Sequence, residues 1–436
     1  MEFDLLIING HLIDPGFGFS KKADIGIAGG KIARIFEEGQ LNKDEIKKYL
    51  GDRVIDAAGA VVATGFLDLH VHFREPGRED KETIMTGSRA AAAGGFTSVC
   101  CMPNTQPAID NQETAKFVTS LAEKGYCRVY CIGAITKNRA GQELSEIGDL
   151  VKAGVVAISD DGDYVQNPEV MRRALEYARM FDIPVISHAE DIFLAAGGLM
   201  NESFQSTRLG MTGRPAVAEE IAIIRDIKLA GLTGSRLHIA HVSTAGGVEA
   251  IRRGKAEGVR VTAEATPHHF TLTDDLIAAR FDTNLRVNPP LRTEADRQAV
   301  IAGLVDGTID CIATDHAPHT DEEKDVEFDQ APPGMIGLET CLGLAITELV
   351  DKGYLTLLDV IRKLSTNPAA IVGLPCNGLS VGETADLVIF DPEAEWTVRR
   401  EGFFSKSKNS PFIGRKLKGK VLATIMNGRV THRAEV

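Results

Sequence analysis

The chain has 436 residues, 44% of them hydrophobic, and a formal net charge of −13. This length is enough for one large domain or about two to three ordinary ones, each with a substantial core. The acidic balance disfavours sequence-independent binding to nucleic-acid backbones or anionic membrane surfaces.

The first ten residues, Met-Glu-Phe-Asp-Leu-Leu-Ile-Ile-Asn-Gly, lack the basic region, apolar run and cleavage site of a signal peptide. No stretch approaches the ~18 apolar residues of a membrane span. We therefore expect a cytoplasmic protein. The seven cysteines are scattered and form no Cys-x-x-Cys pair, which indicates free, buried thiols rather than a zinc finger or a cysteine nucleophile.

Short strand patterns occupy both ends of the chain. Residues 4–13 and 24–35 alternate apolar and polar positions and contain turn signals at Asn9-Gly10 and Gly29-Gly30. Residues 385–391 and 422–430 repeat this style. We expect both ends to build one small β domain, with 1–60 as its N-terminal part, 61–375 as a catalytic barrel and 376–436 as its C-terminal part.

Between these ends, β-branched runs alternate with amphipathic helices. Val61 to His72 is predicted as one buried strand, and helices are predicted after Asn111, after Asn167-Pro168, and from a Thr293–Asp296 capping box to about Gly307. The predicted strands end at His72, Asn104, Ile135, Asp161, His188, His241, His268 and Asp315.

Eight strand–helix units favour an α/β fold of the (β/α)₈ TIM-barrel type, with the small β domain attached. The chain has no glycine-rich dinucleotide or phosphate-binding motif that would favour an open doubly wound sheet. Several of the predicted strands end in His, Asp or Asn. A barrel brings such residues together at its carboxyl end, where active sites lie.

His70 and His72 are two apart on a strand, so their imidazoles point to the same side and could begin a metal site. Alone, this pair is as consistent with two polar residues at a strand end. His238 and His241 are three apart and should face opposite sides of their strand. The strand-end residues as a set are better explained by metal binding than by eight separate structural roles.

Two segments carry a resemblance to a known family: Asp68-Leu-His-Val-His-Phe-Arg-Glu-Pro-Gly77 and Ala313-Thr-Asp-His-Ala-Pro-His319. In this order they resemble dihydroorotases of the long bacterial type, within the metal-dependent amidohydrolases, and the likeness extends over nearly the whole chain. It implies one or two Zn²⁺ ions per chain. The implied metal ligands are His70, His72, Asp161, His188, His241 and Asp315.

The resemblance selects Asp161 over Asp160, His241 over His238 and Asp315 over His316. Many relatives bridge two metals with a carboxylated lysine, but Ser159-Asp-Asp-Gly-Asp163 contains no lysine. Asp161 would then be the bridge.

The implied reaction is the reversible cyclisation of N-carbamoyl-L-aspartate to L-dihydroorotate in pyrimidine biosynthesis. Asp315 is expected to act as general base and acid. Arg74 can form a bidentate pair with the substrate carboxylate. The family match adds further substrate contacts at His72, Asn104, Asn288, His319, Pro333 and Gly334. The roles of His268 and His269 stay open, with structural or supporting roles favoured over ligation.

Two other functions are compatible with these residues. One is a sister cyclic amidohydrolase such as allantoinase or dihydropyrimidinase, which Arg74 and the missing lysine disfavour. The other is an inactive homologue that serves as a structural partner of aspartate transcarbamoylase, which the presence of all six ligand candidates disfavours. The sequence does not decide between a monomer, a homodimer and a complex with aspartate transcarbamoylase.

Overall fold

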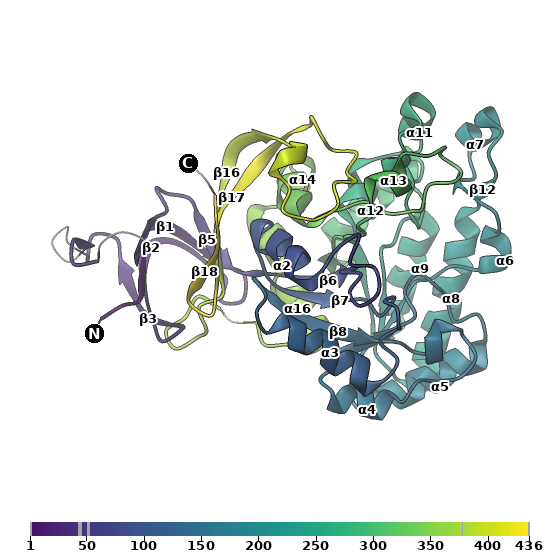
Figure 1. Cartoon of the computed structure of the whole chain (residues 1–436), viewed down its shortest axis with the longest axis horizontal. Coiled ribbons are helices and arrows are strands. Elements are labelled where there is room, and N and C mark those ends of the chain that lie inside the picture. Colours follow the sequence, from purple (N-terminus) through teal and green to yellow (C-terminus); the bar gives the residue numbers. More distant parts are fainter. Residues whose placement is uncertain (1, 42–45, 50–52, 377, 435–436) are drawn as a thin grey trace.

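The computed structural model describes residues 2–41, 46–49, 53–376 and 378–434. A helix-covered barrel occupies one side of the molecule, and a β sheet that contains both chain ends lies beside it (Figure 1).

The barrel is a sheet of eight parallel strands in the spatial order β15-β14-β13-β10-β9-β8-β7-β6. They are β6 (Phe66–Val71), β7 (Phe96–Cys101), β8 (Arg128–Gly133), β9 (Ala157–Ser159), β10 (Val185–Ser187), β13 (Leu237–Ile239), β14 (Val261–Ala265) and β15 (Cys311–Ile312). The His72 N–H donates to the His316 carbonyl over 2.9 Å, and Val71 pairs with His316. These contacts join the two edge strands and close the barrel. The predicted (β/α)₈ fold and its eight strands are confirmed.

One main helix follows each barrel strand. These helices are α2 (Ile84–Ala93), α3 (Gln112–Ala122), α4 (Ile147–Lys152), α5 (Pro168–Arg179), α8 (Ala216–Thr233), α9 (Ala245–Ala256), α12 (Glu294–Asp306) and α15 (Leu357–Leu364). The predicted caps are present: the Asn111 side chain accepts from the Thr114 N–H, Pro168 opens α5, and Thr293 and Asp296 form a capping box. Sequence-local hydrogen bonding therefore sets these helix starts.

Shorter elements decorate the loops. They are α6 (Ile192–Ala195), β11 (Met200–Asn201), α7 (Phe204–Leu209), β12 (Gly213–Arg214), α10 (Pro267–Thr271), α11 (Asp275–Arg280), α13 (Asp321–Lys324), α14 (Cys341–Ala345), α16 (Thr366–Val372), the 3₁₀ turns Lys137–Arg139, Thr283–Leu285, Leu338–Thr340 and Arg400–Gly402, and the π-helical turn Ile346–Val350. Among the described residues, no helix combines the length and apolarity needed to cross a bilayer.

The second sheet has the order β18-β17-β16-β5-β1-β2-β3, with β4 paired to β1. Its strands are β1 (Leu5–Asp14), β2 (Phe19–Ala28), β3 (Lys31–Glu37), β4 (Val54–Asp56), β5 (Val61–Thr64), β16 (Leu387–Thr397), β17 (Lys416–Met426) and β18 (Arg429–Arg433). The two ends of the chain meet where β5 pairs with β16, antiparallel. The prediction that both termini build one β unit is confirmed.

Two local predictions are wrong. The single strand expected from Val61 to His72 is two strands, because Gly65 marks a change of sheet. A Cβ atom at Gly65 would lie 2.3 Å from Thr97, so only glycine allows this close approach. The turn expected at Asn9-Gly10 is instead a bulge within β1, with φ +56° at Asn9.

The C-terminal segment 403–410 packs against the loops at the carboxyl end of the barrel. Asn409 accepts from the His319 N–H over 3.1 Å and donates to the carbonyls of Ala317 and Gly334. The Glu82 side chain accepts from Ser405 Oγ over 2.5 Å. Residues distant in sequence therefore fix these loops.

Candidate active site

The six predicted metal ligands converge at the carboxyl end of the barrel. His70 lies in β6 and His72 just beyond it, and each of the others follows its own strand within three residues. These are Asp161 after β9, His188 after β10, His241 after β13 and Asp315 after β15. All six side chains are buried.

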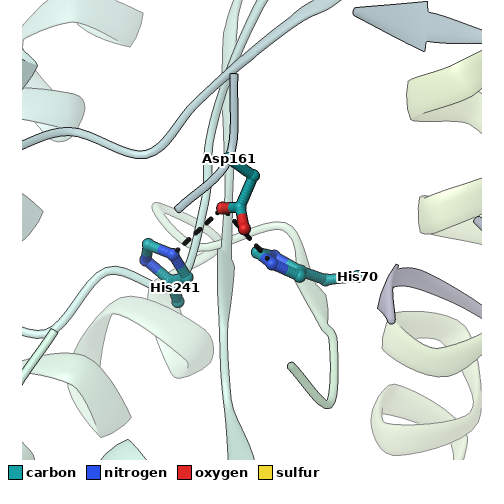
Figure 2. Close-up of side chains that lie close together, drawn as sticks. All are labelled: His70, Asp161 and His241. Atoms are coloured by element: carbon teal, nitrogen blue, oxygen red, sulfur yellow. Dashed lines mark ion pairs between the residues drawn. The ribbon is translucent and has the colours of Figure 1, made fainter. Parts of the chain in front are cut away.

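The Asp161 carboxylate lies at the centre of the four histidines. Its Oδ1 atom is 3.4 Å from His70 Nε2, 3.4 Å from His188 Nδ1 and 3.6 Å from His241 Nε2. Its Oδ2 atom is 3.5 Å from His72 Nε2. Figure 2 shows the carboxylate between the His70 and His241 rings. One carboxylate thus faces both halves of the site.

Asp315 completes the half formed by the first two histidines. Its Oδ1 atom lies 3.0 Å from His72 Nε2 and 3.5 Å from His70 Nε2. Its φ of +48° is a conformation that L-residues seldom adopt, and His241 (+34°) and Arg74 (+62°) share this feature. Such conformations gather at sites where surrounding contacts hold a side chain in a required direction.

Hydrogen bonding decides which ring nitrogens face the site. His70 Nδ1 lies 2.7 Å from Glu264 Oε1, and His72 Nδ1 lies 2.9 Å from Asn104 Oδ1. Both partners are acceptors, so each Nδ1 carries a proton and donates it. In the neutral rings, both Nε2 lone pairs then point at the Asp161 and Asp315 carboxylates.

Such facing acceptors are explained by a cation between them. His70 Nε2 and Asp161 Oδ1 are buried and have no hydrogen-bond partner. Ligands arranged tetrahedrally at ~2.1 Å from a metal lie ~3.4 Å apart, close to the spacings around Asp161. The donors form two groups that share His70, one with Asp161 and His241 and one with His72 and Asp315. Imidazole and carboxylate donors without a thiolate suit Zn²⁺ and similar divalent ions.

The electrostatics of the pocket agree with this fit. Burial opposes the charged form of Asp161, but the attraction of His70 and the hydrogen bond from His188 hold its pKa well below the usual range. Burial also opposes ionisation of Asp315, but His70 and His72 lower its pKa. Burial disfavours the charged form of His70, yet Asp161, Asp315 and Glu264 together raise its pKa well above normal. The site therefore favours positive charge at its centre.

Glu264, which we did not predict from the sequence, joins three histidines from beneath. Its Oε1 atom accepts from His70 Nδ1 and, over 3.2 Å, from the His241 backbone N–H. Its Oε2 atom lies 3.0 Å from His238 Nε2. Burial opposes ionisation, but His70 and His238 lower the pKa of Glu264 to about 2. A charged residue inside the buried strand Val261-Thr-Ala-Glu-Ala265 was the signal that could have found it.

His238, Glu264 and Cys311 also lie close enough to be considered as a third donor group. The Glu264 oxygens already accept hydrogen bonds from His70 and His238. Burial raises the pKa of the Cys311 thiol well above its ordinary value, so the sulfur stays protonated. Hydrogen bonding explains this group without a metal.

The alternatives to the predicted ligands have partners elsewhere. Asp160 accepts from the Thr136 backbone N–H over 3.0 Å, and the His316 ring lies 3.4 Å from Glu82. The His269 ring lies 3.0 Å from the Pro289 carbonyl. His268 Nε2 is buried without a partner, and burial lowers the pKa of His268 to about 4. Neither His268 nor His269 belongs to the two donor groups around Asp161 and Asp315.

The predicted substrate contacts surround the same pocket. Asn104 lies against His72, and Asn288 Nδ2 lies 3.1 Å from His188 Nε2. The Arg214 guanidinium donates to Asn288 Oδ1 over 2.6 Å and also pairs with Glu190. Both asparagines are half-buried beside ligand candidates.

Arg74 and His319 lie on neighbouring loops. Arg74 Nε donates to the Pro318 carbonyl over 3.3 Å, and His319 Nε2 lies 3.0 Å from the Pro333 carbonyl. The Gly334 N–H donates to the Arg286 carbonyl over 2.8 Å. The structure thus places Pro333 and Gly334 beside His319 but has both main-chain groups hydrogen-bonded within the protein.

Comparison with known proteins gives a consistent assignment. Residues 59–246 match the dihydro-orotase-like family. The chain is 54% identical over 432 residues to the dihydroorotase of Pelotomaculum thermopropionicum, which covers 99% of each chain. It is 50% identical over 430 residues to that of Syntrophotalea carbinolica, covering 98% of this chain and 99% of the relative.

Solved structures of other cyclic amidohydrolases have the same fold. The L-hydantoinase of Arthrobacter aurescens superposes with a TM-score of 0.87 at 26% identity, over 100% of this chain and 97% of its own. The dihydropyrimidinase of Brevibacillus agri superposes with a TM-score of 0.81 at 23% identity, over 98% and 95%. At such low identity the second comparison concerns the fold alone.

We expect Glu264→Gln to weaken divalent-metal binding by ~10–100-fold, because the amide turns an N–H group towards one of the three donors that the carboxylate now accepts from. Competition with a chromogenic chelator measures this affinity. Glu348→Gln is the matched control, since Glu348 is a buried carboxylate that pairs with Lys352 and Arg415 instead. Unchanged metal affinity in Glu264→Gln would show that the carboxylate does not orient the ligands.

Proposed function

The chain belongs to the dihydroorotase family, whose members hydrolyse cyclic amides in pyrimidine biosynthesis, and we propose how its residues catalyse that reaction. The reaction is the reversible interconversion of N-carbamoyl-L-aspartate and L-dihydroorotate. The observation that supports this site most directly is the convergence of the His70 and His72 lone pairs on the Asp161 and Asp315 carboxylates.

We propose that His70, His72, Asp161, His188, His241 and Asp315 hold one or two Zn²⁺ ions, with Asp161 as the bridge. A bound divalent metal polarises the substrate carbonyl and makes water a nucleophile near neutral pH. Asn104 and Glu264 accept the Nδ1 protons of His72 and His70, so their role is to keep each Nε2 lone pair directed into the site.

Asp315 is placed to move the proton. In the hydrolytic direction, a water oxygen adds to the ring amide carbon while the Asp315 carboxylate takes the water proton. The carbon–nitrogen bond then breaks, and Asp315 returns the proton to the departing nitrogen. Cyclisation reverses these transfers. His70 and His72 keep Asp315 ionised at neutral pH, as its role as a base requires.

Arg74 is our candidate for recognising the substrate carboxylate. It lies two residues beyond His72, and burial lowers its pKa although Asp315 opposes this effect. A guanidinium that has lost hydration gains from a bidentate carboxylate partner. We propose that Asn104, Asn288, His319 and the Pro333–Gly334 main chain complete the substrate site. For the last pair, the substrate would have to replace the hydrogen bonds described above.

The dihydropyrimidinase-type alternative has specific support in the fold, since the L-hydantoinase shares it over the full chain. Sequence identity favours the dihydroorotase, at 54% against 26%. A place in pyrimidine biosynthesis supports a cytoplasmic location. We also propose that the chain forms a homodimer, and a complex with aspartate transcarbamoylase stays a prediction.

We expect the purified chain to hydrolyse dihydroorotate much faster than allantoin or dihydrouracil, because the latter two lack the carboxylate that Arg74 would bind. Chelation should abolish this activity and added Zn²⁺ should restore it, since an unassisted water is a poor nucleophile at neutral pH. Steady-state rates before and after chelation, with metal analysis of the same samples, measure both. A faster reaction with dihydrouracil would favour the alternative function, and full activity without metal would exclude the mechanism.

For Asp315→Asn we expect kcat to fall by at least ~10²-fold with little change in KM, because the amide cannot accept the proton. Asp321→Asn, at an exposed carboxylate in the same loop region, is the control and should retain activity. Parent-like turnover in Asp315→Asn would mean that another group transfers the proton.

Arg74→Met should lower kcat/KM for dihydroorotate by at least ~10²-fold, since a charged hydrogen bond contributes ~1.5–3 kcal/mol and two would be lost. Slow turnover of neutral dihydrouracil and the metal content should both stay at the parent level. Arg172→Met, on the outer face of α5, is the matched control. Loss of metal, or unchanged kcat/KM, would make Arg74 a structural residue.

A further inference from the structure

Helix α8 is apolar on both of its faces. Ala222, Ile223 and Ile227 pack into the barrel core. On the opposite face, Val217, Ile221 and Ile224 have 41%, 46% and 48% of their surface exposed. Their spacing of four and three residues places them in one stripe. A surface helix normally carries polar residues at these positions, so this stripe lacks an expected partner.

The short helix α6 extends the stripe into a wider surface. Ile192, Phe193 and Leu194 are 46%, 80% and 43% exposed. The Asp191 N–H donates to the Ala218 carbonyl over 2.9 Å, so α6 is tied to the first turn of α8. We call the six exposed side chains of α6 and α8 the α6–α8 patch. It consists of Ile192, Phe193, Leu194, Val217, Ile221 and Ile224.

The size of the α6–α8 patch is near that of a protein interface. At these exposed fractions, six large apolar side chains present several hundred Å² of apolar surface. Patches of this scale on soluble proteins mark interaction sites, and a stable complex covers ~800 Å² on each partner. The patch and the polar rim that surrounds it would together reach that area.

We propose that a second copy of this chain covers the α6–α8 patch, with the two α8 helices packed across a twofold axis. The patch needs an apolar partner of the same extent, and it supplies one to itself. An isologous contact of this kind buries both copies of the patch and leaves none exposed for further growth. A heterologous contact would leave one copy of the patch uncovered at each end of the assembly.

The position of the patch relates it to the active site. The segment between His188 and α8 carries α6 and also Glu190 and Arg214, whose pairing supports Asn288. A partner on the α6–α8 patch would pack against this segment from outside. The dimer contact does not require any catalytic step, so it can be tested separately from the proposed reaction.

Sedimentation velocity of the full chain at micromolar concentration tests the proposal. We expect the parent to be a dimer, and Ile221→Asp to raise the dimer dissociation constant by at least ~100-fold, because an unpaired charge would be buried at the contact. Phe193→Asp, at a position 80% exposed in the free chain, should dissociate the dimer as well and guards against misfolding of the first variant.

Phe117→Asp is the matched control, since Phe117 is 47% exposed on α3 and lies outside the patch. It should sediment like the parent. A monomeric parent would overturn the proposal and leave the patch to a different protein. A dimer that persists in both Ile221→Asp and Phe193→Asp would overturn it too, because the contact would then lie on another surface.

Discussion

Compensation of buried charge is the constraint on which this structure depends. Asp161, Asp315 and Glu264 are almost fully removed from water, and each would be costly there without positive charge beside it. His70 contacts all three, and its raised pKa records the excess of negative charge around it. A divalent cation satisfies the same need better than a proton does, so the fold and the metal site have a common electrostatic basis.

The rest of the barrel supports this charge cluster. Strand β14 supplies Glu264 beneath the histidines, and β6 supplies the two histidines whose outer nitrogens are held by Glu264 and Asn104. The main-chain contact between His72 and His316 closes the barrel at the same place where Asp315 enters the site. Closure of the sheet and assembly of the donors are therefore one structural event.

The sequence predicted the parts of this arrangement that depend on local patterns. Buried strands that end in His or Asp, and capping residues such as Asn111 and Thr293, act within a few residues and are visible in the chain. The parts that were missed depend on contacts between distant segments. Gly65 divides a continuous apolar run because Thr97 approaches it, and the role of Glu264 appears only when β14 lies beside β6 and β13. Likewise, the sequence does not reveal that the main chain at Gly334 is already bonded to Arg286.

The pairing of β5 with β16 has a consequence for synthesis of the protein. On the ribosome, the N-terminal strands emerge first, but the strand that completes their sheet belongs to the last part of the chain. Asn409, which holds the loops around His319, emerges later still. Domains whose segments are continuous can fold while translation proceeds. Here the exposed edge of β5 must wait for nearly the whole chain, so the nascent protein has an interval in which that edge is open to chaperones or to mispairing.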